Sequence, residues 1–165
     1  MRIALALAAL VALSGCGLRP LYGGGGDGRV AAALASVSVA PISGRDGWLV
    51  QNALRDRIAI ADGSAARFRL EVELDDQIEG FGIRADDAVT RERRSLRARY
   101  RLVDLEAGQT VLDATAGSDA GIDVVRSEFA TIAAENTALE RLAAEVADQI
   151  VARIATYAAR APAGP

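Results

Sequence analysis

The feature that most constrains the fold is a strict alternation of apolar and charged residues in two segments, 67–74 and 95–102. The apolar members are Phe68, Leu70, Val72 and Leu74 in the first segment, and Leu96, Ala98, Tyr100 and Leu102 in the second. A period of two places alternate side chains on opposite faces of a strand. Both segments are therefore predicted to be β-strands of a sheet with one apolar face and one charged face.

Two further strands are predicted around this pair. Residues 37–39 alternate valine with serine just before Pro41, which indicates a short first strand. Residues 110–116 follow the turn residues Ala107–Gly108 and predict a last strand. The stretch around Gly80–Gly82 is predicted to be a solvated turn. Its acids, which lack the spacing of a calcium loop, are Asp75, Asp76, Glu79, Asp86 and Asp87.

Two helices are predicted from apolar residues at steps of three, four and seven. The first begins near Asp46, includes Trp48 as a packing residue and ends at Asp62–Gly63. The second begins after Ser127, a typical N-cap, and runs to about Arg160. The order β-α-β-β-β-α predicts an α+β two-layer sandwich, with both helices on one face of a four-stranded mixed sheet. Its first strand should be parallel to the second.

The N-terminus is predicted to be a lipoprotein signal peptide, residues 1–15, which is cleaved. Its apolar run of eleven residues, 3–13, is too short to span a bilayer, which takes about 20 residues. The run ends in Leu13-Ser14-Gly15-Cys16, a match to the bacterial lipobox. We therefore expect Cys16 to carry a diacylglycerol and an N-acyl chain.

The rest of the chain divides into a tether, a domain and a tail. Residues 16–34 contain the sequence GGGGDG and are expected to be a flexible tether. Residues 35–161 are expected to form one α+β domain, followed by a tail at 162–165. Gly17 stands where an aspartate retains many lipoproteins in the inner membrane, so we expect anchoring on the periplasmic side of the outer membrane.

Composition excludes several classes of function. The chain has 165 residues with no histidine and one cysteine. Ser-His-Asp and Cys-His catalysis and histidine-ligated metals are therefore ruled out, and we expect no enzyme activity, no catalytic residue, no metal and no cofactor. The net charge of −3 argues against a nucleic-acid partner.

Arginines are concentrated on the charged face of the predicted sheet. They are Arg67, Arg69, Arg97, Arg99 and Arg101, with Arg93 and Arg94 just before. A guanidinium group is suited to phosphate oxygens, so these residues could contact lipid A phosphates or a partner protein. Ion pairs with Glu71 and Glu73 on the neighbouring strand could equally account for them. The sequence leaves both interpretations open.

One combination of motifs resembles a known family. Cys16-Gly17-Leu18-Arg19-Pro20-Leu21-Tyr22-Gly23 is close to the CGFRPLYG start of the lipopolysaccharide (LPS)-assembly lipoprotein family LptE in its alphaproteobacterial form, with Leu18 in place of Phe. Residues 127–130 and 147–157 also match, whereas the middle strands match only in pattern. The resemblance implies an outer-membrane lipoprotein that plugs the LPS-translocating β-barrel LptD and assists its assembly. It also implies LPS binding, which is known of family members.

The segment after Cys16 is a second candidate contact. Leu18, Pro20, Leu21 and Tyr22 could dock on the barrel wall, because proline stiffens the chain and an aromatic ring suits a membrane–water boundary. A plain spacer is the other interpretation. The alternative function is that of an accessory lipoprotein of an ABC-type lipid-transport system in the envelope.

Overall fold

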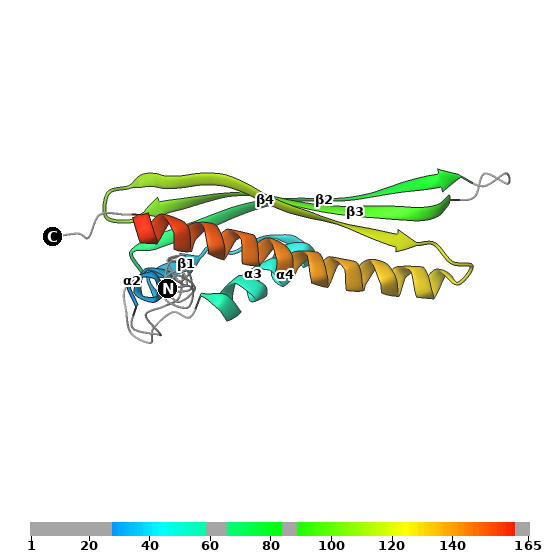
Figure 1. Ribbon diagram of the computed structural model, residues 1–165, viewed down its shortest axis with the longest axis horizontal. Helices are drawn as coiled ribbons and strands as arrows, with labels where there is room; N and C mark the ends of the chain where they lie inside the picture. Colours follow the sequence, from blue (N-terminus) through cyan, green and yellow to red (C-terminus); the bar gives the residue numbers. More distant parts are fainter. Residues whose placement is uncertain (1–27, 59–65, 84–88, 161–165) are drawn as a thin grey trace, which may run out of the picture.

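The structure, a computed structural model, describes residues 28–58, 66–83 and 89–160. Within these ranges the chain forms a four-stranded sheet with three helices on one side of it (Figure 1). The elements are α2 (Arg29–Ala35), β1 (Val37–Val39), α3 (Gly44–Arg57), β2 (Phe68–Ile83), β3 (Val89–Asp104), β4 (Gln109–Asp123) and α4 (Glu128–Arg160). The predicted α+β class and mixed sheet are confirmed.

The sheet has the order β1-β2-β3-β4, so the three long strands form a meander. β1 is parallel to β2, as the crossover rule predicts, and the other pairs are antiparallel. Leu70 of β2 lies opposite Leu102 of β3, and both side chains are buried. We call this apolar side, which faces the helices, the inner face of the sheet, and the opposite, charged side the outer face.

The long strands extend well beyond their predicted ends. β2 and β3 each have 16 residues, so Asp75, Asp76 and Glu79 lie within β2 and their assignment to a turn region was wrong. Asp76 pairs with Arg94 and Glu79 pairs with Arg93, both on β3. Ion pairs between the two strands therefore continue the sheet after the apolar alternation has ended.

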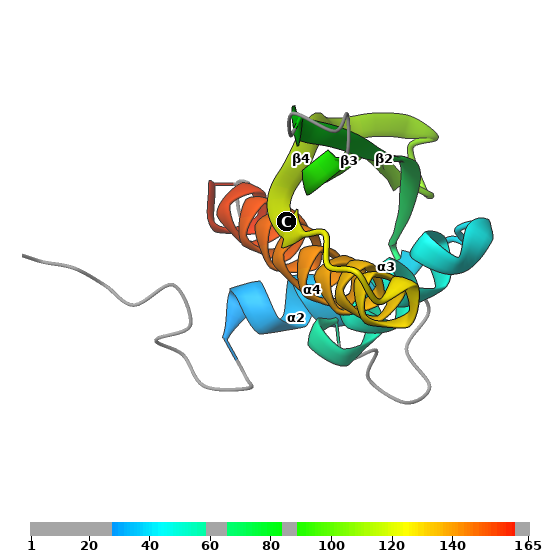
Figure 2. The ribbon, with the colours of Figure 1, turned by 90° about the vertical axis from the view of Figure 1, so that its right-hand side faces the viewer.

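α4 provides most of the helical cover of the inner face. Ser127, the predicted N-cap, accepts a hydrogen bond at Oγ from the Ala130 amide at 3.4 Å. Leu142, Val146 and Ile150 are fully buried, and Ala147 is equally inaccessible. Figure 2 shows the sheet curving above α4. Small side chains on this helix allow it to approach the strands closely.

α3 differs from its prediction in two respects. It ends at Arg57, before the predicted stop at Asp62–Gly63. Trp48 is 61% exposed, so its assignment as a packing residue was wrong. The buried face of α3 is formed by residues such as Val50 and Leu54, which lie at helical spacing, and Trp48 falls outside that face.

α2 is a third helix that the sequence analysis did not predict. It is only seven residues long, and all but its last residue, Ala35, fall within residues 16–34, the range expected to be a tether. Such a short helix is not stable alone, and it depends on tertiary packing. Here α2 contacts α4, and Leu34 is only 6% exposed. A helix of this kind has no strong signature in sequence.

Candidate functional site

The outer face carries a row of arginines on β3 with acids on both neighbouring strands. In the pairing of β3 with β2, Arg101 lies opposite Glu71, Arg99 lies opposite Glu73 and Arg97 lies opposite Asp75. On the other side, Arg101 lies opposite Asp113 of β4. Because β3 is a central strand, its outer-face arginines have neighbours on both β2 and β4 from which carboxylates can reach them.

Each arginine of β3 on the outer face forms an ion pair. The pairs are Arg91–Asp123 (3.2 Å), Arg93–Glu79 (2.7 Å), Arg97–Asp119 (2.9 Å), Arg99–Asp113 (3.2 Å) and Arg101 with Glu73 (3.5 Å) and Glu71 (3.7 Å). We call this arrangement the arginine row. Its positive charge is matched by carboxylates on the same face, so it is not a basic patch.

The other predicted arginines are also paired, but they lie outside the arginine row. Arg69 pairs with Glu71 at 3.3 Å, and Arg67 pairs with Asp104 at 3.4 Å while its guanidinium carbon lies 5.1 Å from the centre of the Phe68 ring. Arg94 belongs to the inner face instead. Its side chain is only 11% exposed and binds Asp76.

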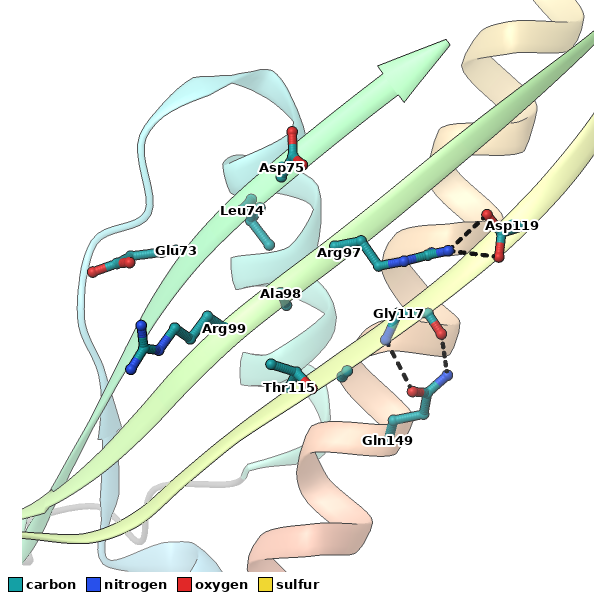
Figure 3. Close-up of a pocket in the computed structure, with 11 residues that line it drawn as sticks. Glu73, Leu74, Asp75, Arg97, Ala98, Arg99, Thr115, Gly117, Asp119 and Gln149 are labelled. Carbon is teal, nitrogen blue, oxygen red and sulfur yellow. Dashed lines mark hydrogen bonds and ion pairs between the residues drawn. The ribbon is translucent and has the colours of Figure 1, made fainter. Parts of the chain in front are cut away.

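Arg97 has the most defined geometry of the row. Its Nη2 donates to both carboxylate oxygens of Asp119, each at 2.9 Å, and its Nη1 donates to the Ser118 carbonyl at 2.9 Å. The side chain lies across Gly117, where a Cβ would come within 2.5 Å of the Arg97 Cδ. The absence of a side chain at Gly117 is therefore what lets Arg97 turn toward β4 (Figure 3).

The free edge of β4, the last strand of the sheet, is bonded to α4 at the same glycine. Gln149 of α4 accepts a hydrogen bond from the Gly117 amide and donates one to the Gly117 carbonyl, both at 3.1 Å (Figure 3). This side-chain amide bonds the edge as a neighbouring strand would. Gly117 thus joins the arginine row to α4.

A hollow lies beside Arg97 and extends along the outer face. Its volume is about 790 Å³, and Glu73, Asp75 and Arg99 line it together with Thr115 and Asp119. A second hollow of about 460 Å³ also has Asp75, Arg97 and Asp119 in its lining. Figure 3 shows Arg97 extending toward Asp119 and away from Arg99, with the hollow beside them.

Hydrogen bonding fixes the charge state of these pairs. The hydroxyl of Ser95 and, after it, the guanidinium of Arg97 lower the pKa of Asp119 below its usual value. The hydrogen bond to Asp113 raises the pKa of Arg99. Both effects favour the ionised forms. The row therefore presents fixed donors and acceptors of both signs, which suits a polar protein surface better than a phosphate group.

Three members of the row's acidic border were missed by the sequence analysis: Asp113, Asp119 and Asp123 of β4. The signal was present, because aspartate or a small residue occupies every second position from 113 to 123. The predicted strand ended at Ala116, so this period was not followed to Asp119 and Asp123.

The remaining predicted features fall outside the described residues. They are Cys16 and the segment Leu18, Pro20, Leu21 and Tyr22. In the part of the chain that the structure does describe, no cluster of acids could hold a metal ion. No helix in those same ranges has the length and apolar character needed to cross a membrane.

A family model identifies the family of this chain. Residues 34–154 match the family model "LptE: Lipopolysaccharide-assembly". The fold resembles that of a candidate lipoprotein from Caulobacter crescentus, with a TM-score of 0.68 and 30% identity over 81% of this chain and 100% of the other. No curated protein matches.

Two more distant structures share the fold alone. Rare lipoprotein B from Shewanella oneidensis gives a TM-score of 0.53 at 16% identity, over 73% of this chain and 92% of the other. A minor lipoprotein from Acinetobacter baumannii gives 0.56 at 16% identity, over 78% and 94%.

Proposed function

We propose, from the premise that this chain belongs to the LPS-assembly family LptE, that it is the lipid-anchored plug of the LPS-translocating outer-membrane β-barrel LptD. In this role it occupies the barrel lumen, assists barrel assembly and supports the transport of LPS to the cell surface. It acts by binding and positioning and catalyses no reaction.

The observation that carries this proposal is the charge balance of the outer face. A plug must present a polar surface to a polar lumen wall, because the interior of a large barrel is lined by polar side chains. The arginine row offers donors and acceptors of both signs, each already held in place by an ion pair. Such a surface can meet a wall of mixed charge without leaving a charge buried and unpaired.

The predicted arginines are therefore assigned to the barrel rather than to lipid A phosphates. Arg67, Arg69, Arg97, Arg99 and Arg101 each have a carboxylate partner within 4.0 Å. A phosphate group would first have to displace that partner, which costs much of the energy that it would gain. Contact with the barrel needs no such exchange.

The N-terminal segment supplies the anchor in this proposal. Cys16 carries the acyl chains, and two or more chains hold a protein on a membrane firmly. Leu18, Pro20, Leu21 and Tyr22 then dock on the barrel wall near the membrane boundary. Replacing Cys16 with alanine should release the protein from the outer membrane, and it would then be recovered in the periplasmic fraction.

Co-purification tests the proposal directly. The cell envelope is solubilised, the full chain is captured through a C-terminal tag, and the retained proteins are identified. A large β-barrel retained in about equal amount supports the plug. Recovery of an inner-membrane ATPase complex with no barrel would instead identify an accessory lipoprotein of an ABC-type lipid-transport system.

A paired substitution separates barrel contact from direct LPS contact. The double variant Arg97→Glu, Arg99→Glu should weaken retention of the barrel, because two ion pairs become repulsive. Binding of LPS to the purified chain should change little. Loss of LPS binding with the barrel still retained would show that these arginines hold the glycolipid itself.

A further inference from the structure

The apolar stripe of α4 is buried along most of the helix but not at its beginning. Apolar residues at alternating steps of three and four include Phe129, Ile132, Leu139, Val146 and Ile150. Leu139, Val146 and Ile150 are at most 2% exposed, whereas Phe129 is 87% exposed and Ile132 is 47% exposed. Asn136 interrupts this stripe between Ile132 and Leu139. The apolar residues after it are covered, and those before it are open.

The position of α3 explains where the cover stops. Arg45, the second residue of α3, donates a hydrogen bond to the Asn136 side chain at 2.7 Å. Arg57, its last residue, bonds to Asp148. α3 therefore lies beside residues 136–148 of α4, and the first two turns of α4 extend beyond it. The end of the molecule that holds these turns lacks α2, α3 and β1 (Figure 1).

One more apolar side chain belongs to this open region. Val125, in the connection from β4, donates its amide to the Thr131 hydroxyl at 3.4 Å and is 51% exposed. Thr131 itself is buried, so the opposite side of these turns is already packed. We call Val125, Phe129 and Ile132 the stripe end.

We propose that the stripe end is the apolar anchor by which this chain binds its protein partner, and that an apolar pocket on that partner receives Phe129. The inference rests on the proposed function, which makes the partner the β-barrel. Side chains of the partner pack against the first two turns of α4, as α3 packs against the residues from Asn136 onward. The arginine row then supplies a polar contact on a different face.

The chemistry of the stripe end favours a protein over a lipid surface. It consists of three apolar side chains, one of which is a highly exposed aromatic ring, and its neighbours are the exposed residues Arg126 and Glu128. A central aromatic anchor with a charged rim is typical of protein interfaces. A helix that lies in an anionic membrane carries a basic face instead, whereas the first turn of α4 carries Glu128.

Residues 161–165 cannot cover the stripe end. They follow Arg160, at the opposite end of a helix of 33 residues, which is about 50 Å long. The five residues 161–165 reach at most about 18 Å when fully extended.

The test is retention of the barrel by the full chain carrying Phe129→Ala and Ile132→Ala. Alanine preserves the helix, and both side chains are exposed, so the thermal midpoint should stay close to that of the parent. We expect barrel recovery to fall at least tenfold. Matched controls are Trp48→Ala and Leu105→Ala, which remove exposed apolar side chains elsewhere and should leave recovery unchanged.

The outcomes separate this inference from the proposed function. If the parent chain retains the barrel and the double variant retains it equally well, the inference is wrong and the plug stands. If the parent retains no barrel, the proposed function fails first. Light scattering that shows a parent dimer abolished by the double variant, with barrel retention unchanged, would identify a second copy as the occupant. Loss of binding to anionic lipid vesicles, with retention unchanged, would identify a lipid surface. Either result overturns the inference.

Discussion

Two arginine–aspartate pairs three residues apart on β3 have the same chemistry but different surroundings. Arg97 bonds to both carboxylate oxygens of Asp119 on the outer face, where the two side chains are 49% and 46% exposed. Arg94 bonds to both oxygens of Asp76 on the inner face, where the exposures are 11% and 18%. Because Arg94 and Arg97 are an odd number of residues apart on one strand, their side chains point to opposite faces of the sheet.

The difference shows that burial, and not bond geometry, decides what an ion pair does here. Water solvates either outer partner when the other is removed, so this pair contributes little to stability and leaves its groups available to a partner surface. The inner pair also fixes α4, because Arg94 Nη1 donates to the Glu135 carbonyl at 2.8 Å. Removing Asp76 would leave a charge confined between the sheet and the helix.

The largest effect is expected from Asp76→Ala. It leaves the Arg94 guanidinium buried and unpaired, and we expect the free energy of unfolding in urea to fall by about 3 kcal/mol. The matched control Asp119→Ala breaks the outer pair and should cost only about 0.2 to 1 kcal/mol. Equal losses for the two variants would contradict the comparison.

A smaller and more local effect is expected from Gly117→Ala. The new Cβ would meet the Arg97 side chain at 2.5 Å and force it away from Asp119. The pKa of Asp119, measured by NMR titration, should then rise toward its usual value, while the free energy of unfolding changes by no more than about 1 kcal/mol. Gly121→Ala is the control, since nothing lies within 4 Å of a Cβ there. An unchanged Asp119 pKa in Gly117→Ala would show that the glycine does not position Arg97.

The smallest effect is a pH dependence that has opposite signs on the two faces. On the inner face, burial and then the neighbouring Glu135 raise the pKa of Glu92, and one Glu92 oxygen is buried without a hydrogen bond. A raised carboxyl pKa means that the folded state holds the proton more tightly. Stability is therefore lost as the pH rises from the unfolded pKa, 4.5, through the folded value.

The stability of the variant Glu92→Gln tests the sign of this pH dependence. The variant should be more stable than the parent at about pH 7, and the difference should become small at about pH 4, where the parent Glu92 is mostly protonated in both states. Asp119, with its lowered pKa, gives the reverse: its contribution is present above 3.8 and is lost as the pH falls through the folded value. Urea unfolding at pH 7 and pH 4 measures the Glu92 effect, and unfolding continued below pH 3.8 measures the Asp119 effect. A Glu92→Gln variant that is less stable at pH 7 would refute the assignment.

The elements whose residues carry a regular pattern could be predicted from the sequence. The alternation at 67–74 and 95–102 identified β2 and β3, and the long periodicity after Ser127 identified α4. Prediction failed where contact with another element, and not a residue pattern, decides the structure. Seven residues of α2 are helical only because α4 lies beside them, and Trp48 is helical but sits off the buried face of α3.

The candidate site divides in the same way. The sequence placed Arg97, Arg99 and Arg101 on one face and proposed Glu71 and Glu73 as partners, and the pairs of Arg101 with these two acids are confirmed. It did not find Asp113 and Asp119, because the choice between a carboxylate on β2 and one on β4 depends on which neighbour leaves room for the arginine.

The sequence by itself determined which side chains share a face, because a period of two or of 3.6 fixes direction without reference to the rest of the chain. Only the tertiary structure decided which charges are buried, which acid each arginine meets and where the stripe of α4 remains open. Those outcomes depend on strand register and on where α3 ends against α4, which are set by contacts between segments far apart in sequence.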